Sequence, residues 1–180
     1  MGPRGACVRA ALGIHPGSGS QRPVVRGCIA RGNGSDGLFL CWRVRHGLFE
    51  ENQLLENGGF GVSIGHKDSD NLLRRNLVRG NARHGFYFRN EAEGMAGHRN
   101  RIEENTIEDN GREGEAAAIA IDGETGGTVI RGNTIRDTRA GDARRQRTAV
   151  RIGAKAGEVT VEGNKIEADR EVEDLRQGGR

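Results

Sequence analysis

Residues 65–70, with the sequence GHKDSD, bring together side chains that could transfer protons or hydrolyse a bond. His66 and Lys67 supply an imidazole and an amine, two groups that can act as general acid and base. Asp68 adds a carboxylate, and a pair of carboxylates can hydrolyse a glycosidic bond when their separation is suitable. The candidate partner for such a pair is Asp122.

A metal site is the other chemistry to consider. The ligand-type side chains in or shortly before this segment are His46, His66, Asp68 and Asp70. Their spacing matches no recognised metal motif. The three cysteines are odd in number and lack CxxC spacing, which argues against a metal cluster or a disulfide framework. We therefore predict no metal site from the residues themselves.

Composition limits the class of protein. The 180 residues are enough for one domain, and 30 glycines beside one Trp and one Tyr favour many tight turns over a helical bundle. The formal charge of +3 creates no field that would demand nucleic acid. No apolar run approaches the ~20 residues that span a bilayer, and the apolar run near Met1 is too short to predict a signal peptide.

The segment belongs to an internal repeat. Glycines at 37, 61 and 85 and asparagines at 33, 57 and 81 recur every 24 residues. Aligning the repeats produces apolar columns with a period of two along each strand, which indicates alternating faces. The inward columns are Leu38, Val62, Phe86, Ile119 and Val150; Leu40, Ile64, Phe88, Ile121 and Ile152; Val25, Phe49, Leu73, Ile102, Ile130 and Val161; and Leu54, Val78, Ile107, Ile135 and Ile166.

Polar columns accompany the apolar ones. Asparagines form two ladders: Asn52, Asn76, Asn105, Asn133 and Asn164; and Asn33, Asn57, Asn81 and Asn110. Charges alternate in two outward columns: Arg26, Glu50, Arg74, Glu103, Arg131 and Glu162; and Arg79, Glu108, Arg136 and Glu167. Stacked amides can bond from coil to coil, and opposite charges on neighbouring strands fix the register. We interpret these columns as structural.

These patterns predict an all-β fold, a right-handed parallel β-helix of about six coils with a period of about 24 residues. A leucine-rich repeat is disfavoured because leucines are few and the corners are asparagine-glycine.

We expect residues 1–24 to form an N-terminal cap or incomplete coil, with a small helix in ACVRAALG. Residues 25–168 would form the solenoid, and residues 169–180 a poorly ordered polar tail. The arginine-rich loop at 138–148 is expected to be a mobile, solvated insertion rather than an anion site.

The stretches NLLRRNLVRGNARHGFYF, RIEENTIEDNG and TVIRGNTIRDT resemble right-handed parallel β-helix repeat proteins, a group that includes pectate-lyase-like and polygalacturonase-like enzymes. The resemblance implies an acidic polysaccharide as partner, an extracellular or periplasmic location, and calcium as an ion that the group can use. It also implies that Lys67 or Arg89 would be the base of a lyase-like reaction. The polygalacturonase motifs are missing apart from GHK at residues 65–67, and no three-acid cluster is evident for calcium.

In the predicted register, residues 65–70 follow the first strand of one coil and lie beside the equivalent corners of its neighbours. If this corner is catalytic, Lys67 or Arg89 would remove an uronate C5 proton and His66 would protonate the leaving oxygen. Exposed rings and charges also suit the binding of a sugar polymer. The predicted substrate-binding residues are Trp42, Arg43, His46, Tyr87, Glu91 and His98. The sequence leaves two alternatives open, a non-catalytic structural solenoid and a fragment of a larger carbohydrate-active protein.

Overall fold

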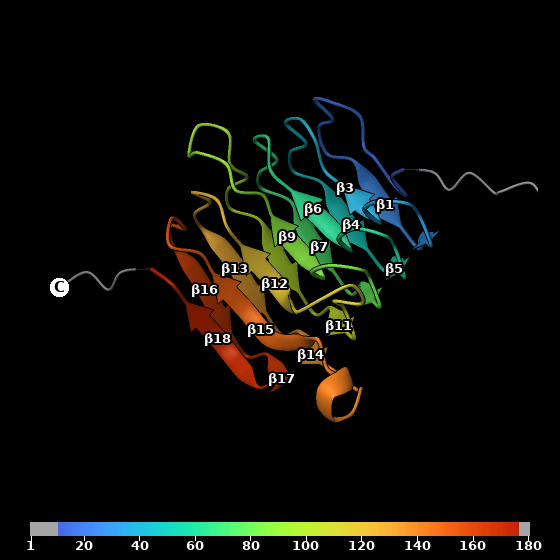
Figure 1. The fold of residues 1–180 in the computed structure, drawn as a ribbon. Helices are drawn as coiled ribbons and strands as arrows, with labels where there is room; N and C mark the ends of the chain where they lie inside the picture. Colours follow the sequence, from blue (N-terminus) through green and yellow to red (C-terminus); the bar gives the residue numbers. More distant parts are fainter. Residues whose placement is uncertain (1–10, 177–180) are drawn as a thin grey trace, which may run out of the picture.

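The computed structural model describes residues 11–176 as a solenoid built from three parallel six-stranded sheets (Figure 1). The first sheet contains β1 (Val24–Arg26), β4 (Leu48–Glu50), β7 (Leu72–Arg74), β10 (Arg101–Glu103), β13 (Thr128–Arg131) and β16 (Val159–Glu162). The second contains β2 (Ile29–Arg31), β5 (Gln53–Leu55), β8 (Leu77–Arg79), β11 (Thr106–Glu108), β14 (Thr134–Arg136) and β17 (Lys165–Glu167). The third contains β3 (Leu38–Phe39), β6 (Val62–Ile64), β9 (Phe86–Phe88), β12 (Ala116–Ile121), β15 (Gln146–Ile152) and β18 (Arg170–Asp174).

The predicted parallel β-helix is confirmed, and six strands per sheet correspond to about five full turns. Equivalent asparagines are 24 residues apart in the first coils and 29, 28 and 31 apart in the later ones. The predicted period of 24 therefore holds only for the first coils. The later coils are longer mainly because residues are inserted in the loops between strands, and one further residue is accommodated by a register shift between β12 and β15 at Ala116 and Ala117.

The apolar columns form the core. Each strand pairs with its equivalent one coil later, so that Phe49 lies between Val25 and Leu73, and Val62 lies between Leu38 and Phe86. The central members of every column are buried. Because all strands are parallel and in register, the side chain at each inward position stacks on a side chain of the same kind.

The asparagine ladders are buried and fully hydrogen-bonded. The side-chain amide of Asn76 donates to Asn105 Oδ1 and to the carbonyl of Phe49, both at 2.9 Å. The backbone N–H of Asn76 donates to the same Oδ1 at 2.9 Å. The second ladder ends at Gln146, which replaces the next asparagine and accepts from Asn110 at 2.8 Å. Each amide thus satisfies backbone groups at a bend where no strand partner is available.

A third, shorter ladder escaped the sequence analysis. Asn71 accepts from the backbone of Gly47 at 2.8 Å and donates to Asn100 Oδ1 at 3.0 Å. Asn100 in turn donates to the carbonyl of Asp68 at 2.8 Å. The sequence does contain a signal for this ladder, because Asn71 and Asn100 have the same separation of 29 residues as Asn76 and Asn105. This ladder fixes the corner that follows the third sheet.

Six of the eight neighbouring positions in the two alternating columns form ion pairs among the described residues, and the steps from Arg74 to Glu103 and from Arg136 to Glu167 do not. Glu50 is buried between Arg26 and Arg74, and Arg74 Nε lies 2.8 Å from its carboxylate. Hydrogen bonds from Arg26 and then Arg74 lower the pKa of Glu50. Arg136 likewise binds Glu108 at 2.9 Å. The columns therefore fix the register between neighbouring coils, which accounts for many of the arginines.

The solenoid extends beyond the predicted boundaries. Strand β18 lies in the segment expected to be a poorly ordered tail, and it pairs with β15 because Val172 continues the apolar column at Val150. At the other end Ile14 bridges to Leu38 and packs on the core. Most of the predicted helical cap at ACVRAALG lies outside the described residues.

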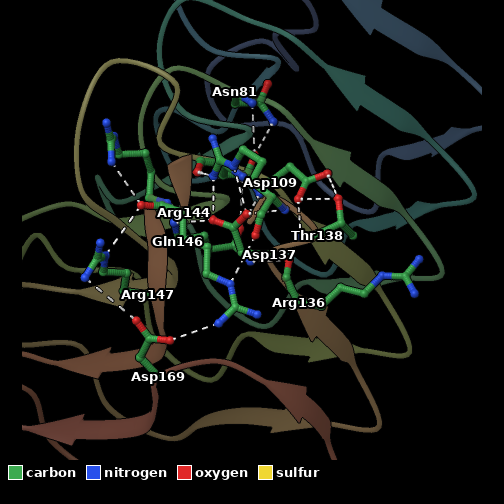
Figure 2. A network of polar contacts seen from close by, with 12 residues as sticks. Asn81, Asp109, Arg136, Asp137, Thr138, Arg144, Gln146, Arg147 and Asp169 are labelled. Atoms are coloured by element: carbon green, nitrogen blue, oxygen red, sulfur yellow. Dashed lines mark hydrogen bonds and ion pairs between the residues drawn. The ribbon is translucent and has the colours of Figure 1, made fainter. Parts of the chain in front are cut away.

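The arginine-rich loop is tied to the solenoid by one buried carboxylate (Figure 2). Asp137 accepts from the backbone N–H groups of Arg145 and Gln146, both at 2.8 Å, and pairs with Arg139 at 2.7 Å. Arg144 reaches Asp169 at 3.1 Å. Burial is the largest single influence and would raise the pKa of Asp137. The hydrogen bonds from Arg139 and from the backbone together outweigh it, so the pKa is lowered. The loop, expected to be mobile, is held by internal contacts, and it includes the 3-10 turn Gly141–Ala143.

Breaking the first ladder at its middle should destabilise the whole stack. We expect Asn105→Ala to lower the free energy of unfolding by about 3 kcal/mol, because it leaves buried groups of Asn76 and Asn133 without partners. Urea denaturation followed by circular dichroism measures the change. Asn90→Ala, at an exposed asparagine, is the control and should change the value by less than about 0.5 kcal/mol. Equal effects of the two substitutions would contradict a structural role for the ladder.

Candidate functional site

The loops that follow β3, β6 and β9 lie next to one another along one side of the solenoid (Figure 1). We call residues 41–46, 65–70 and 89–99 the Trp42 corner. The third ladder aligns the first two loops, since Asp68 Oδ1 accepts from Val44 at 2.9 Å and Asn71 accepts from Gly47. The corner brings together most of the residues that the sequence analysis selected.

Trp42 is the exposed aromatic residue of this corner. Its ring stacks on His66 with centroids 4.8 Å apart and planes 6° apart, and 43% of the residue is exposed. His66 thus covers one face of the indole, while the residue as a whole remains exposed. A flat, supported ring of this kind can stack on the apolar face of a sugar.

The hydrogen bonds of His66 assign its tautomer. Nδ1 lies 2.9 Å from the thiol of Cys41 and 3.2 Å from Arg89 Nη2, and both of these groups carry hydrogens. Nδ1 is therefore an acceptor. The ring hydrogen lies on Nε2, which donates a hydrogen bond to Glu91 at 3.0 Å. Glu91 also accepts from the backbone N–H of His66. Both ring nitrogens are thus engaged within the protein, and burial raises the pKa of the neighbouring Cys41 thiol.

Arg89 is held by contacts on all sides. Its guanidinium donates to Ser63 and to the carbonyl of Leu40, both at 2.9 Å, and lies over the Phe39 ring at 4.7 Å. It also approaches Asp68 and Glu91, each at 3.4 Å, and 15% of its side chain is exposed. The guanidinium is occupied by acceptors of the corner, so this geometry does not favour the predicted role of base.

Asp68 is fully buried at the turn. Its oxygens accept from the backbone of Val44 and Gly65 at 2.9 and 3.3 Å. Burial is the largest influence on this carboxyl and raises its pKa to about 6, although these bonds and Arg89 act in the opposite direction. Asp68 therefore stabilises the corner from inside and has no surface to offer a substrate.

The other corner residues differ in how they are held. Lys67 is partly exposed and, within residues 11–176, forms no ion pair. Arg43 and His46 are exposed and have left-handed backbone angles of 58° and 55°, which turn them outward at the bend. His98, in the insertion, accepts from Gly126 at 3.2 Å and contacts the carbonyl of Glu93 at 2.8 Å, so it closes its own loop.

The two remaining predicted residues lie beside the corner, in a groove that reaches Arg89. Tyr87 and Asp122 line a hollow of about 400 Å³ on the outer side of the third sheet, together with Phe60 and His84. Asp122 pairs with Arg151 at 2.9 Å. Burial raises the pKa of Tyr87, and the negative charge of Asp122 adds to this effect. The structure does not place Asp122 in the same hollow as Asp68, which is buried beneath the Trp42 corner.

That hollow is part of a longer groove that the sequence analysis missed. It shares Phe60 and Arg83 with a hollow of about 430 Å³, and His84 with a third of about 300 Å³. Phe60 stacks on Tyr87 with centroids 4.2 Å apart. Burial lowers the pKa of His84 to about 4, which keeps the imidazole neutral. The residues Phe60 and His84 occupy turns before strands, where no column of equivalent residues marks them.

Neither a metal cluster nor a membrane helix is found within the described chain. Across residues 11–176, no group of three or more His, Cys, Asp and Glu side chains is arranged to hold a metal ion. No helix in that range is long and apolar enough to span a bilayer.

Comparison with known proteins agrees with the architecture. The family model described as the right-handed β-helix region matches residues 11–166 of this chain. The chain belongs to this family. No curated protein matches.

Two solved structures are similar to this member of the right-handed β-helix family. The A-module of the mannuronan C-5 epimerase AlgE4 from Azotobacter vinelandii aligns with 93% of this chain and 48% of its own, at 17% identity and a TM-score of 0.57. The AlgE6 A-module of the same organism aligns with 89% and 59%, at 13% identity and a TM-score of 0.43. The chain spans about half the length of these modules. The likeness to the AlgE4 module shows the fold alone.

The raised pKa of Asp68 predicts a pH dependence of stability. The folded protein keeps this proton up to about pH 6, whereas the unfolded chain loses it near its ordinary value of 3.8. Folding is therefore penalised as the pH rises through this range. Asp68→Asn should remove the penalty, so its free energy of unfolding relative to the parent should rise by about 2–3 kcal/mol between pH 4 and 7.

Asp70→Asn is the matched control, measured by urea denaturation across the same pH range. Hydrogen bonding to Arg99 lowers the pKa of Asp70, so its contribution is lost on acidification. That loss occurs below the ordinary value of 3.8, so the relative stability of this variant should stay nearly constant between pH 4 and 7. The same pH trend in both variants would contradict the assignment of Asp68.

Proposed function

We propose that this right-handed β-helix binds an acidic polysaccharide at the Trp42 corner. The observation that carries the proposal is the exposed indole of Trp42, supported from behind by His66 at 4.8 Å. In a soluble fold most large rings are covered, so an exposed, rigid ring on a polar surface favours a binding role.

The charges around the ring favour an anionic ligand. Arg43 and Arg45 are exposed, Lys67 is partly exposed, and within the described residues none of these three cations forms an ion pair. The nearby acid Asp70 is already bound by Arg99 at 2.7 Å. Uncompensated cations beside an aromatic platform match the carboxylates and the apolar ring faces of a uronic acid polymer.

The fold likeness gives secondary support. The AlgE4 A-module is named for a reaction on mannuronan, a polymer of uronic acid units, and it shares the architecture of this chain at low identity. Its activity is not transferred here, since Arg89, Asp68 and His66 are engaged in contacts within the corner. Binding is the function that the exposed side chains support.

The test follows the fluorescence of Trp42, the single tryptophan of the chain, during titration with alginate, polygalacturonate and a neutral glucan. We expect a saturable change with the acidic polymers that weakens as salt is added, and none with the glucan. Trp42→Phe and the double variant Arg43→Ala with Lys67→Ala, assayed by affinity electrophoresis, should each weaken binding about tenfold.

Arg112→Ala is the matched control, because Arg112 is exposed and lies outside the Trp42 corner. This variant should bind like the parent. Equal losses with Arg112→Ala and the corner variants would show that retention reflects overall charge. Absence of any fluorescence change with every acidic polymer would contradict the proposal.

A lyase-like reaction is the second candidate, and Lys67 is the observation that favours it. Its amine is free of ion pairs among residues 11–176 and lies at the cationic surface, unlike the guanidinium of Arg89. In β-elimination, Lys67 would accept the C5 proton of a uronate, the C4–O bond would break, and a C4–C5 double bond would form. The leaving oxygen would take its proton from solvent, since both nitrogens of His66 are engaged.

Mass spectrometry after incubation with the acidic polymers distinguishes this reaction from binding alone. Unsaturated fragments that disappear with Lys67→Gln, in a variant that retains the parent's melting temperature, would establish the lyase. Fragments that gain water would point to hydrolysis instead. Intact polymer in the presence of calcium would leave binding as the function and reject the lyase.

A further inference from the structure

Three side chains at the Trp42 corner form a chain of hydrogen bonds that joins a thiol, an imidazole and a carboxylate. Cys41 Sγ lies 2.9 Å from His66 Nδ1, and His66 Nε2 lies 3.0 Å from Glu91 Oε1. The backbone N–H of His66 also donates to Glu91, so this carboxylate holds both the ring and the main chain of the histidine. A nucleophile bonded to a base that a third group orients is an arrangement typical of covalent catalysis.

The fold builds this arrangement from three successive coils. Cys41, Gly65 and Arg89 occupy equivalent positions shortly after β3, β6 and β9. The middle position has to be glycine, because a Cβ there would lie 2.6 Å from both Arg89 Nε and Glu91 Oε2. The space left by the missing side chain is where Arg89 and Glu91 reach back to His66.

The surroundings of the thiol decide when its proton can move. Burial is the largest influence on Cys41 and raises its pKa, although the charge of Arg89 acts in the opposite direction. The proton therefore stays on sulfur at rest and leaves only as His66 accepts it during an attack. Arg89 Nη2, 3.2 Å from Nδ1, opposes a positive charge on the ring, whereas Glu91 at Nε2 favours it.

The approach to the thiol restricts the size of a substrate. Cys41 is 8% exposed, and the side chain of His66 is 29% exposed. The hollow of about 430 Å³ adjoins this site, because its lining includes Arg89 and Phe39, the residue two places before Cys41. The position therefore suits a small acyl group, such as acetyl, better than a bulky one.

We propose that Cys41, His66 and Glu91 form a thiol-based acyl-transfer site that hydrolyses small carboxylic esters. Cys41 is the nucleophile, His66 is the general base, and Glu91 is a positioning residue that holds the ring through Nε2. The positive charge of Arg89, at the wall of the hollow, favours the carbonyl oxygen that becomes negative during the attack. This activity is independent of polysaccharide binding, because it needs only the triad and the hollow.

The triad, the ester and water supply every atom of the reaction. The proton of Sγ moves to His66 Nδ1 as a bond forms between sulfur and the ester carbonyl carbon. The C–O bond to the alcohol then breaks, the alcohol takes the proton from Nδ1, and a thioester remains on Cys41. Water next gives a proton to Nδ1 and attacks the thioester carbon. The C–S bond breaks, the carboxylic acid leaves, and sulfur regains its proton from His66.

Incubation of the reduced full chain with p-nitrophenyl acetate tests the site. Absorbance follows the release of nitrophenolate, and peptide mass spectrometry locates the acetyl group. Cys28 is a control within the same chain, because it is exposed and its thiol contacts the carbonyl of Arg26 instead of an imidazole. We expect acetylation of Cys41 to be about tenfold faster than that of Cys28 despite its burial, and the acetyl group to be released again by hydrolysis.

Equal rates at the two thiols, or acetylation of Cys28 alone, would overturn the proposal. An acetyl group that stays on Cys41 would exclude the hydrolytic step. This comparison needs no substitution, so it decides the proposal even where a variant fails to fold.

Variants separate the roles of the three residues. Cys41→Ala should abolish the reaction, and His66→Gln should slow acylation about 100-fold, a typical contribution of a general base. Glu91→Gln keeps an oxygen acceptor for Nε2 and removes the charge, so it should lower kcat about tenfold and leave KM unchanged. Cys28→Ala is the matched control and should react like the parent. A reaction that survives Cys41→Ala, or the parent's rate in a folded His66→Gln variant, would contradict the assigned roles.

Discussion

The buried asparagine ladders are the interaction on which the rest of the structure depends. A coil of this solenoid has short strands, so most of its backbone groups near the bends have no strand partner. The asparagine side chains supply the missing partners. The amide of Asn76, for example, donates to the carbonyl of Phe49 in the coil before it and to Asn105 in the coil after it. Because an unpaired buried amide costs about 1–3 kcal/mol, a coil shifted by one residue would lose several such bonds. The ladders therefore make one register far more stable than its alternatives.

A fixed register divides the charged residues into two groups. Those in columns, such as Glu50 between Arg26 and Arg74, neutralise one another and hold the coils together. Those in the corner loops have no equivalent in the next coil and are free to meet other partners. Part of the corner is nevertheless used for stability, since Asp68 and Arg89 bind backbone groups. Lys67 and Arg43 form no ion pair within residues 11–176, and together with the ring of Trp42 they are the groups that we propose for ligand binding.

The sequence by itself determined the fold, the core columns, the two main ladders and the charge pairs, because each of these depends on residues that repeat at a fixed spacing. It placed Trp42, His66 and Glu91 in one corner for the same reason. Only the tertiary structure decided what these residues can do. The tautomer of His66, the burial of Asp68 and the groove around Phe60 depend on non-repeating side chains from several coils. Such contacts are set by loop conformation and packing, and no column in the sequence records them.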